Sequence, residues 1–88
     1  MAEVRAGVDA LDGQIVALLR KRFRFMEAAA RIKEARDQVR DEARKSAVIE
    51  QAEAQAVELG IPAGVVARLY EQLVEASIAY ELERFDER

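Results

Sequence analysis

The sequence of 88 residues contains no cysteine, no histidine and no tryptophan, and Pro62 is its only proline. Without cysteine the chain can form neither disulfides nor thiolate metal sites. Without histidine it lacks the most common general base and the most common metal ligand. The sequence therefore gives no reason to expect a bound metal or any other cofactor.

Long apolar stretches are also missing. No run approaches the roughly 20 residues that a membrane-spanning helix needs, and no signal-peptide pattern precedes the first expected helix. We therefore expect a cytoplasmic protein with no membrane partner.

The charge is unevenly distributed along the chain. Residues 1–45 carry eleven Lys/Arg and eight Asp/Glu, a net of +3, whereas residues 46–88 carry three and nine, a net of −6. The basic cluster at residues 20–24 is accompanied by no groove-reading motif, and the whole chain is acidic. We therefore interpret the cluster as a solvated face and expect no nucleic-acid partner.

The periodicity of apolar residues predicts an all-α chain with three helices in one domain, residues 1–88. A long first helix is expected over residues 3–36. The second should follow the polar stretch 37–41 and stop at Gly60, and the third should begin near Pro62 and continue to about residue 85.

Apolar rows mark the expected inner faces of these helices. The row of the first helix is Val4, Val8, Leu11, Ile15, Leu18, Phe25, Ala29 and Ile32. That of the second is Ile49, Ala52, Ala56 and Leu59. That of the third is Val66, Leu69, Leu73, Ala76, Ile78, Leu82 and Phe85.

A cation interrupts the row of the first helix. Arg22 occupies an apolar position, and Lys33, eleven residues later at about 100° per residue, lies on nearly the same face. An unpaired buried charge costs several kcal/mol, so we expect an anion beside Arg22. Two readings remain open, a site for a small anion and an internal salt bridge or solvent-reaching side chain.

The first helix is too long for a compact single chain. It would span about 50 Å, whereas a globule of this size has a radius of gyration near 12 Å. A second copy in an intertwined twofold homodimer would cover the protruding apolar row. Such a dimer would bring Arg5 near the partner's Arg22 region. The alternative is that Arg5 is simply an exposed arginine near the start of the helix.

The third helix carries Ser77 and Glu81 four residues apart on one largely apolar face. Burial favours a protonated carboxyl group, whereas a nearby cation favours the carboxylate. Glu81 is therefore either a protonated donor or a paired carboxylate, unless it forms an ordinary surface salt bridge with Arg84.

The spacing of Leu11-Asp12, Arg22 and Arg31-Ile32-Lys33 resembles that of the all-α chorismate mutases of bacteria. The resemblance covers nearly the whole chain and implies an interlocked dimer of three-helix chains. It implies catalytic roles for Lys33 and Glu81 and substrate binding by Arg5 from the partner chain, Arg22, Asp41, Arg44 and Ser77. The family also includes isochorismate-pyruvate lyases.

Two positions depart from the pattern of that family. Glu81 stands where most bacterial members have a glutamine, although fungal members have a glutamate. Lys45 stands where the family often has a glutamate. The segment from Lys33 to Arg44 is also one residue shorter than in the best-known mutases, and its spacing is closer to that of the lyases.

The resemblance implies the one-step rearrangement of chorismate to prephenate, which needs no nucleophile, metal or obligatory proton transfer. Arginines suit the two carboxylates of this substrate. Lys33 and a donor at position 81 would stabilise charge on the ether oxygen. The alternatives are an isochorismate-pyruvate lyase, a mutase of an amino analogue of chorismate, and a non-catalytic helical dimerisation or regulatory module.

Overall fold

The computed structural model describes residues 1–88, whose regular elements are all helices. Helix α1 spans Ala2–Ile32, the short 3₁₀ helix η1 spans Arg36–Gln38, α2 spans Glu42–Glu58 and α3 spans Val65–Asp86. The prediction of an all-α chain with three helices and a long first helix is confirmed. None of these helices is both long and apolar enough to cross a membrane.

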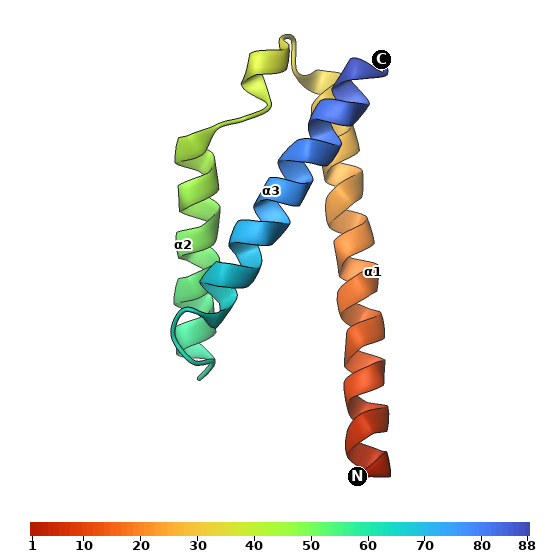
Figure 1. The fold of residues 1–88 in the computed structure, drawn as a ribbon, viewed down its shortest axis with the longest axis vertical. Helices are drawn as coiled ribbons and strands as arrows, with labels where there is room; N and C mark the ends of the chain where they lie inside the picture. Colours follow the sequence, from red (N-terminus) through yellow and green to blue (C-terminus); the bar gives the residue numbers. More distant parts are fainter.

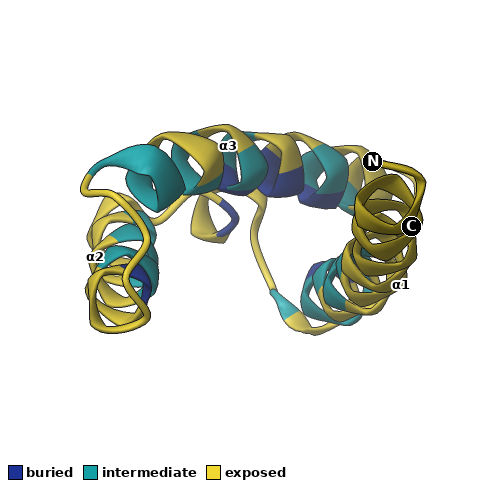
Figure 2. Ribbon diagram, turned by 90° about the horizontal axis from the view of Figure 1, so that it is seen from below, coloured by how far each residue is buried: buried dark blue, intermediate teal, exposed yellow.

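Helix α3 connects the other two helices. α1 and α2 each pack against α3 but not against each other, and in Figure 1 α3 crosses diagonally between them. Seen end-on, α1 and α2 lie on the same side of α3, and the buried part of α3 faces the space between them (Figure 2). The N-terminal half of α1 extends away from this assembly, and the chain measures 50 × 24 × 15 Å.

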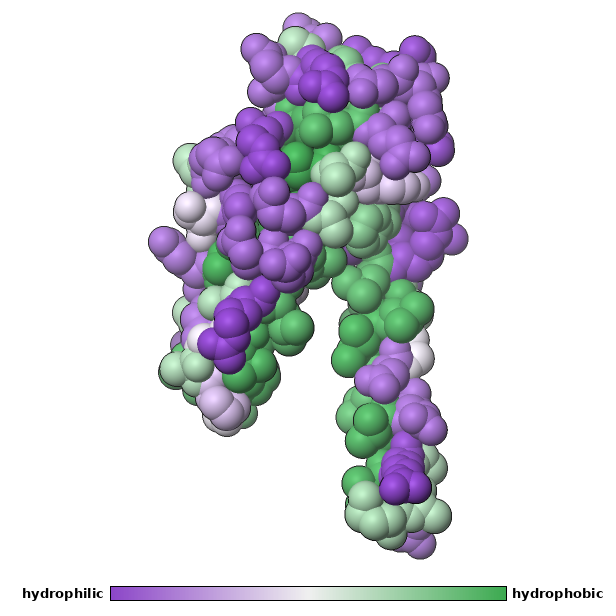
Figure 3. All heavy atoms as spheres, viewed as in Figure 1, coloured by the Kyte–Doolittle hydropathy of each residue, from purple (hydrophilic) through white to green (hydrophobic).

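Few side chains are buried within a single chain. Only 7 of the 88 residues are buried, and three of them, Val39, Val74 and Ile78, form the apolar cluster. The large apolar side chains of the N-terminal half of α1 are exposed, namely Val4, Val8, Leu11, Ile15, Val16 and Leu18. Figure 3 shows apolar surface along this free part of α1, on the side that faces α2. A second copy would cover this surface, and the dimer stays a prediction.

The apolar row of α1 does not stay on one side of the helix. Phe25 and Ile32 are 72% and 77% exposed, so within a single chain α3 leaves this part of the row uncovered. At 100° per residue they lie about 60° and 80° around the helix from Arg22, whereas Lys33 lies only about 20° away. The prediction that Arg22 and Lys33 share one face is confirmed, since both line one cavity.

The buried face of α3 also differs from the expected row. It consists of Val74, Ser77, Ile78 and Glu81, at the helical spacing i, i+3, i+4 and i+7. Leu69 and Ala76, which the row places inside, are exposed, as is Leu59 at the end of α2. A search for apolar periodicity does not find this face, because two of the four buried residues, Ser77 and Glu81, are polar.

Helix α1 ends four residues before the predicted position 36. Lys33 leaves the helix with an extended backbone, at φ −63° and ψ 138°. The N–H groups of Glu34 and Ala35 then donate to Oε1 of Gln38, at 2.8 and 3.1 Å. These bonds support η1, which takes up part of the segment expected to be the end of the first helix and a loop.

Helix α2 begins and ends where the sequence predicts. Oδ1 of Asp41 accepts the N–H of Arg44 at 3.0 Å, so Asp41 caps the N-terminus of the helix. The helix ends at Glu58, and Gly60 follows with φ of 81°, a conformation that glycine adopts most readily.

Helix α3 starts at Val65 and not at Pro62, so the prediction that this proline opens the helix is wrong. The carboxylate of Glu53 in α2 accepts the N–H groups of Gly64 and Ala67, at 2.7 and 3.0 Å. An anion at a helix N-terminus satisfies free N–H groups and complements the helix dipole. A long-range contact therefore helps to fix where α3 begins.

Candidate functional site

A cavity of about 380 Å³ lies between α1, the N-terminal part of α2 and the buried face of α3. This is a volume suited to a small ligand. Its polar lining residues come from every element of the chain: Arg22, Lys33, Gln38, Asp41, Arg44, Lys45, Ser77 and Glu81. Four of these are cations and two are acids.

Arg22 marks one end of the cavity. Its Nη1 donates to Oγ of Ser77 at 2.6 Å, and that hydroxyl donates onward to the carbonyl of Leu73 at 2.7 Å. The guanidinium carbon lies 6.0 Å from the ring centroid of Tyr70. Arg22 forms no salt bridge, so its interpretation as part of an internal salt bridge is wrong.

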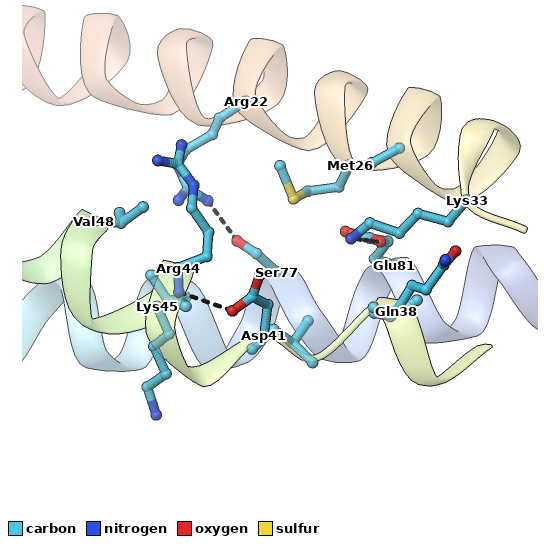
Figure 4. Close-up of a pocket in the computed structure, with 14 residues that line it drawn as sticks. Arg22, Met26, Lys33, Gln38, Asp41, Arg44, Lys45, Val48, Ser77 and Glu81 are labelled. Carbon is cyan, nitrogen blue, oxygen red and sulfur yellow. Dashed lines mark hydrogen bonds and ion pairs between the residues drawn. The ribbon is translucent and has the colours of Figure 1, made fainter. Parts of the chain in front are cut away.

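Arg44 reaches the same end of the cavity from the first turn of α2 (Figure 4). Its backbone N–H is bound by Asp41, but its guanidinium has no hydrogen-bond or salt-bridge partner. Arg22 and Arg44 also line a second, shallower hollow with Tyr70, so the two side chains are neighbours. Two adjacent guanidinium groups without a carboxylate partner form a site for an anion.

Lys33 and Glu81 mark the other end of the cavity. Nζ of Lys33 lies 2.6 Å from Oε2 of Glu81, whose side chain is only 6% exposed. The alternative pairing of Glu81 with Arg84 is wrong, because Arg84 pairs with Glu87 at 3.3 Å. In this structure Glu81 accepts a hydrogen bond from an ammonium group, which is the paired-carboxylate arrangement.

Lys45 borders the cavity but its ammonium group points away from it (Figure 4). Nζ lies 2.7 Å from Glu71 and 2.9 Å from Glu75, both in α3, and these hydrogen bonds raise the pKa of Lys45. Glu75 also binds Arg40 at 2.9 Å. Hydrogen bonds from Arg40 and then Lys45 lower the pKa of Glu75 to about 2. Lys45 therefore serves to join α2 to α3.

The structure brings together six of the seven residues singled out in the sequence. Lys33, Glu81, Arg22, Arg44, Asp41 and Ser77 all line the cavity, whereas Arg5 is exposed on the free part of α1 and does not. The carboxylate of Asp41 is used as the cap of α2. A contribution of Arg5 requires a second chain and stays a prediction.

Gln38 was missed by reasoning from the sequence. Its side chain borders the cavity while its Oε1 accepts two backbone N–H groups of the preceding segment. It lies in a polar stretch with no periodic pattern, so no signal in the sequence distinguishes it from its neighbours. The chain has no group of three or more acidic side chains arranged to hold a metal ion.

Comparison with known proteins agrees with this geometry. The family described as chorismate mutase type II matches residues 4–82, which include every polar residue of the cavity. No curated protein and no solved structure gives a significant match. Because the match covers nearly all of the chain and the fold is all-α, the chain belongs to the type II chorismate mutase family.

Proposed function

We propose that this protein is a chorismate mutase, an isomerase that rearranges chorismate to prephenate without a cofactor. The observation that carries the proposal is the pair Arg22 and Arg44, whose guanidinium groups adjoin one cavity and have no carboxylate partner. Chorismate is a dicarboxylate, and two guanidinium groups without a carboxylate partner complement a dianion of this kind. Ser77, bound to Arg22, would hold that guanidinium in position.

The proposed role of the arginines is to hold the reacting ends of chorismate together. In the rearrangement the ether C–O bond breaks while a C–C bond forms between the enolpyruvyl side chain and the ring. Fixing the carboxylates favours the folded conformation in which those carbons are close, which lowers the entropic part of the barrier. No atom is exchanged with the protein, so the site needs no nucleophile.

The proposed role of Lys33 is electrostatic. Negative charge develops on the ether oxygen as the C–O bond breaks, and a positioned ammonium group stabilises that charge in the transition state. Glu81, 2.6 Å from the ammonium group, holds Lys33 in the unliganded chain. When protonated, Glu81 could itself donate to the ether oxygen, as an amide would.

The proposal includes a homodimer with composite sites. The free part of α1 exposes a row of apolar side chains that one chain leaves uncovered, and Arg5 lies on that part. A partner packed along α1 would bury the row and would bring its own Arg5 toward the cavity. A non-catalytic dimerisation module would explain the apolar row, but it would give no reason for two unpaired guanidinium groups beside a cavity.

Lys45 keeps an isochorismate-pyruvate lyase as a second candidate. The family often has a glutamate at this position, which can bind a substrate hydroxyl. A lysine supplies no carboxylate there, and its ammonium group is held outside the cavity by Glu71 and Glu75. The test is incubation of the purified protein with chorismate and with isochorismate. Prephenate from chorismate supports the mutase, salicylate with pyruvate from isochorismate supports the lyase, and no product from either contradicts both.

A further inference from the structure

The C-terminal end of α1 is not explained by its own sequence. Lys33, Glu34, Ala35 and Arg36 are all good helix formers, and no glycine or proline follows Ile32 closely. The helix nevertheless ends at Ile32, and Lys33 turns into an extended conformation. A helix end leaves backbone carbonyl groups without partners, so something outside the helix must satisfy them here.

Arg88 satisfies them. Its Nη1 donates to the carbonyl oxygens of Lys33 at 2.6 Å and Ala30 at 3.0 Å, and longer contacts of 3.5 Å reach the carbonyls of Arg31 and Glu34. A cation at the C-terminus of a helix also complements the negative end of the helix dipole. Arg88 is thus a long-range cap of α1.

The guanidinium group of Arg88 also contacts the last turn of α3. Its central carbon lies 3.9 Å from the ring centroid of Phe85, within cation–π distance. Phe85 lies one turn after Glu81 in α3. The same helix therefore contacts Lys33 twice, with Glu81 at the ammonium group and with Arg88, which follows α3, at the carbonyl oxygen.

All three polar groups of Lys33 are fixed in this way. Its N–H donates to the carbonyl of Ala29 at 2.9 Å, its carbonyl accepts from Arg88, and its ammonium group binds Glu81. Arg88 itself does not line the cavity. Without Arg88 the carbonyl groups of Ala30 and Lys33 would lose a partner, and the last turn of α1, which carries Lys33, would open more easily.

We propose that Arg88 is a positioning residue for catalysis, which caps α1 and thereby fixes the Lys33 ammonium group at one end of the cavity. The inference rests on the proposed function of Lys33. Arg88 acts through Lys33 and not on the substrate, so its loss should lower kcat more than it changes KM.

The test compares three variants with the wild-type protein. Arg88→Met keeps an extended side chain but removes every hydrogen-bond donor. Arg88→Lys keeps one cationic nitrogen, and in the wild type one nitrogen, Nη1, makes the two shortest contacts. Arg84→Met is the matched control, because Arg84 lies four residues before Arg88, in the last turn of α3, and binds only Glu87. Steady-state kinetics with chorismate are measured where circular dichroism shows all four proteins to be folded.

We expect Arg88→Met to lower kcat about tenfold to hundredfold, the effect of a small displacement of a catalytic group. Arg88→Lys should recover part of the loss, and Arg84→Met should match the wild type. An unchanged kcat in Arg88→Met overturns the proposal. So does an equal loss in Arg84→Met, or no recovery in Arg88→Lys, since either would indicate general destabilisation.

Amide hydrogen exchange at Lys33 gives a readout that does not depend on turnover. Its N–H belongs to the last bond of α1, so exchange should become faster in Arg88→Met and remain slow in Arg84→Met. Unchanged exchange overturns the capping role. If the wild type converts no chorismate while exchange still responds to Arg88→Met, the proposed function fails and the cap stands without a catalytic purpose.

Discussion

The ammonium group of Lys33, at the end of α1, lies 2.6 Å from Oε2 of Glu81 on the buried face of α3. The two residues are 48 positions apart in the sequence, and their contact joins α1 to α3. Both line the same cavity as Arg22 and Arg44. Burying a charge is costly unless it is paired, so this contact offsets the cost of placing the Glu81 side chain on the buried face of α3. The same pair supplies the two side chains proposed to act at the ether oxygen.

Replacing Lys33 with alanine should remove most of the activity. The cation stabilises charge that develops only in the transition state, so its loss should cost about 3 kcal/mol, or roughly 150-fold in kcat. Lys21→Ala is the control, because Lys21 is exposed on α1 and forms no salt bridge. Near-normal turnover by folded Lys33→Ala would refute the catalytic role.

Replacing Glu81 with glutamine tests whether this position donates a hydrogen bond to the ether oxygen. A carboxylate cannot donate there, whereas an amide can. Glu81→Gln should therefore keep or raise kcat with chorismate, and Glu81→Ala, which has no side-chain donor, should lower it at least about tenfold. Equal kcat in Glu81→Gln and Glu81→Ala would argue against a donor role. A folded but inactive Glu81→Gln would instead mean that the carboxylate is needed as the partner of Lys33.

Mixed dimers test whether the sites are shared between chains. Arg5→Ala and Arg22→Ala should each be inactive alone, but a heterodimer of the two would contain one site with both arginines intact. Activity should therefore appear after subunit exchange, which is verified by mass spectrometry of the native dimer. Exchange without recovery would mean that Arg5 does not act in the partner's site, and a monomer in sedimentation would contradict the dimer itself.

Acidification should weaken the contact between α2 and α3 through Glu75. Its pKa is about 2 in the folded chain, lowered by hydrogen bonds from Arg40 and Lys45. Because the pKa of Glu75 is lower in the folded chain than in the unfolded chain, where it is about 4.5, the carboxylate stabilises the fold above pH 4.5. This stabilisation is lost as the pH falls toward about 2. Between pH 5 and about 2.5, Tm should fall more for the wild type than for Glu75→Gln.

Glu83→Gln is the control for that comparison, because Glu83 is exposed on the same helix and forms no salt bridge. Its Tm should fall with pH as steeply as that of the wild type. Equal pH dependence of the wild type and Glu75→Gln would show that the ion pairs with Arg40 and Lys45 contribute nothing measurable.

Removing the carboxylate of Glu53 should destabilise the start of α3. It accepts two backbone N–H groups there, and caps of this kind contribute about 1–2 kcal/mol. Urea unfolding of Glu53→Ala should show a loss of that size relative to Glu50→Ala, whose glutamate is exposed on α2 and unpaired. Equal stability of the two variants would mean that water replaces the carboxylate at no cost.

Local pattern was sufficient for the helices and for part of the site. Apolar periodicity depends on residues three or four apart, so the all-α class and the shared face of Arg22 and Lys33 follow from the sequence alone. The end of α2 before Gly60 follows in the same way, because glycine readily adopts the positive φ found there. The resemblance to the family added the residues from α2 and α3, which no spacing could place opposite α1.

Tertiary contacts decided what the local pattern left open. Arg88 ends α1 and Glu53 starts α3, and these cap contacts join residues up to 58 and 14 positions apart. Ser77, 55 positions from Arg22, binds its guanidinium group where one interpretation of the sequence expected an internal salt bridge. Phe25 and Ile32 lie outside because α3 covers only the side of α1 that carries Arg22 and Lys33. Propensity and periodicity act over a single turn, whereas partners for helix ends and buried charges come from whichever segments the packing brings together.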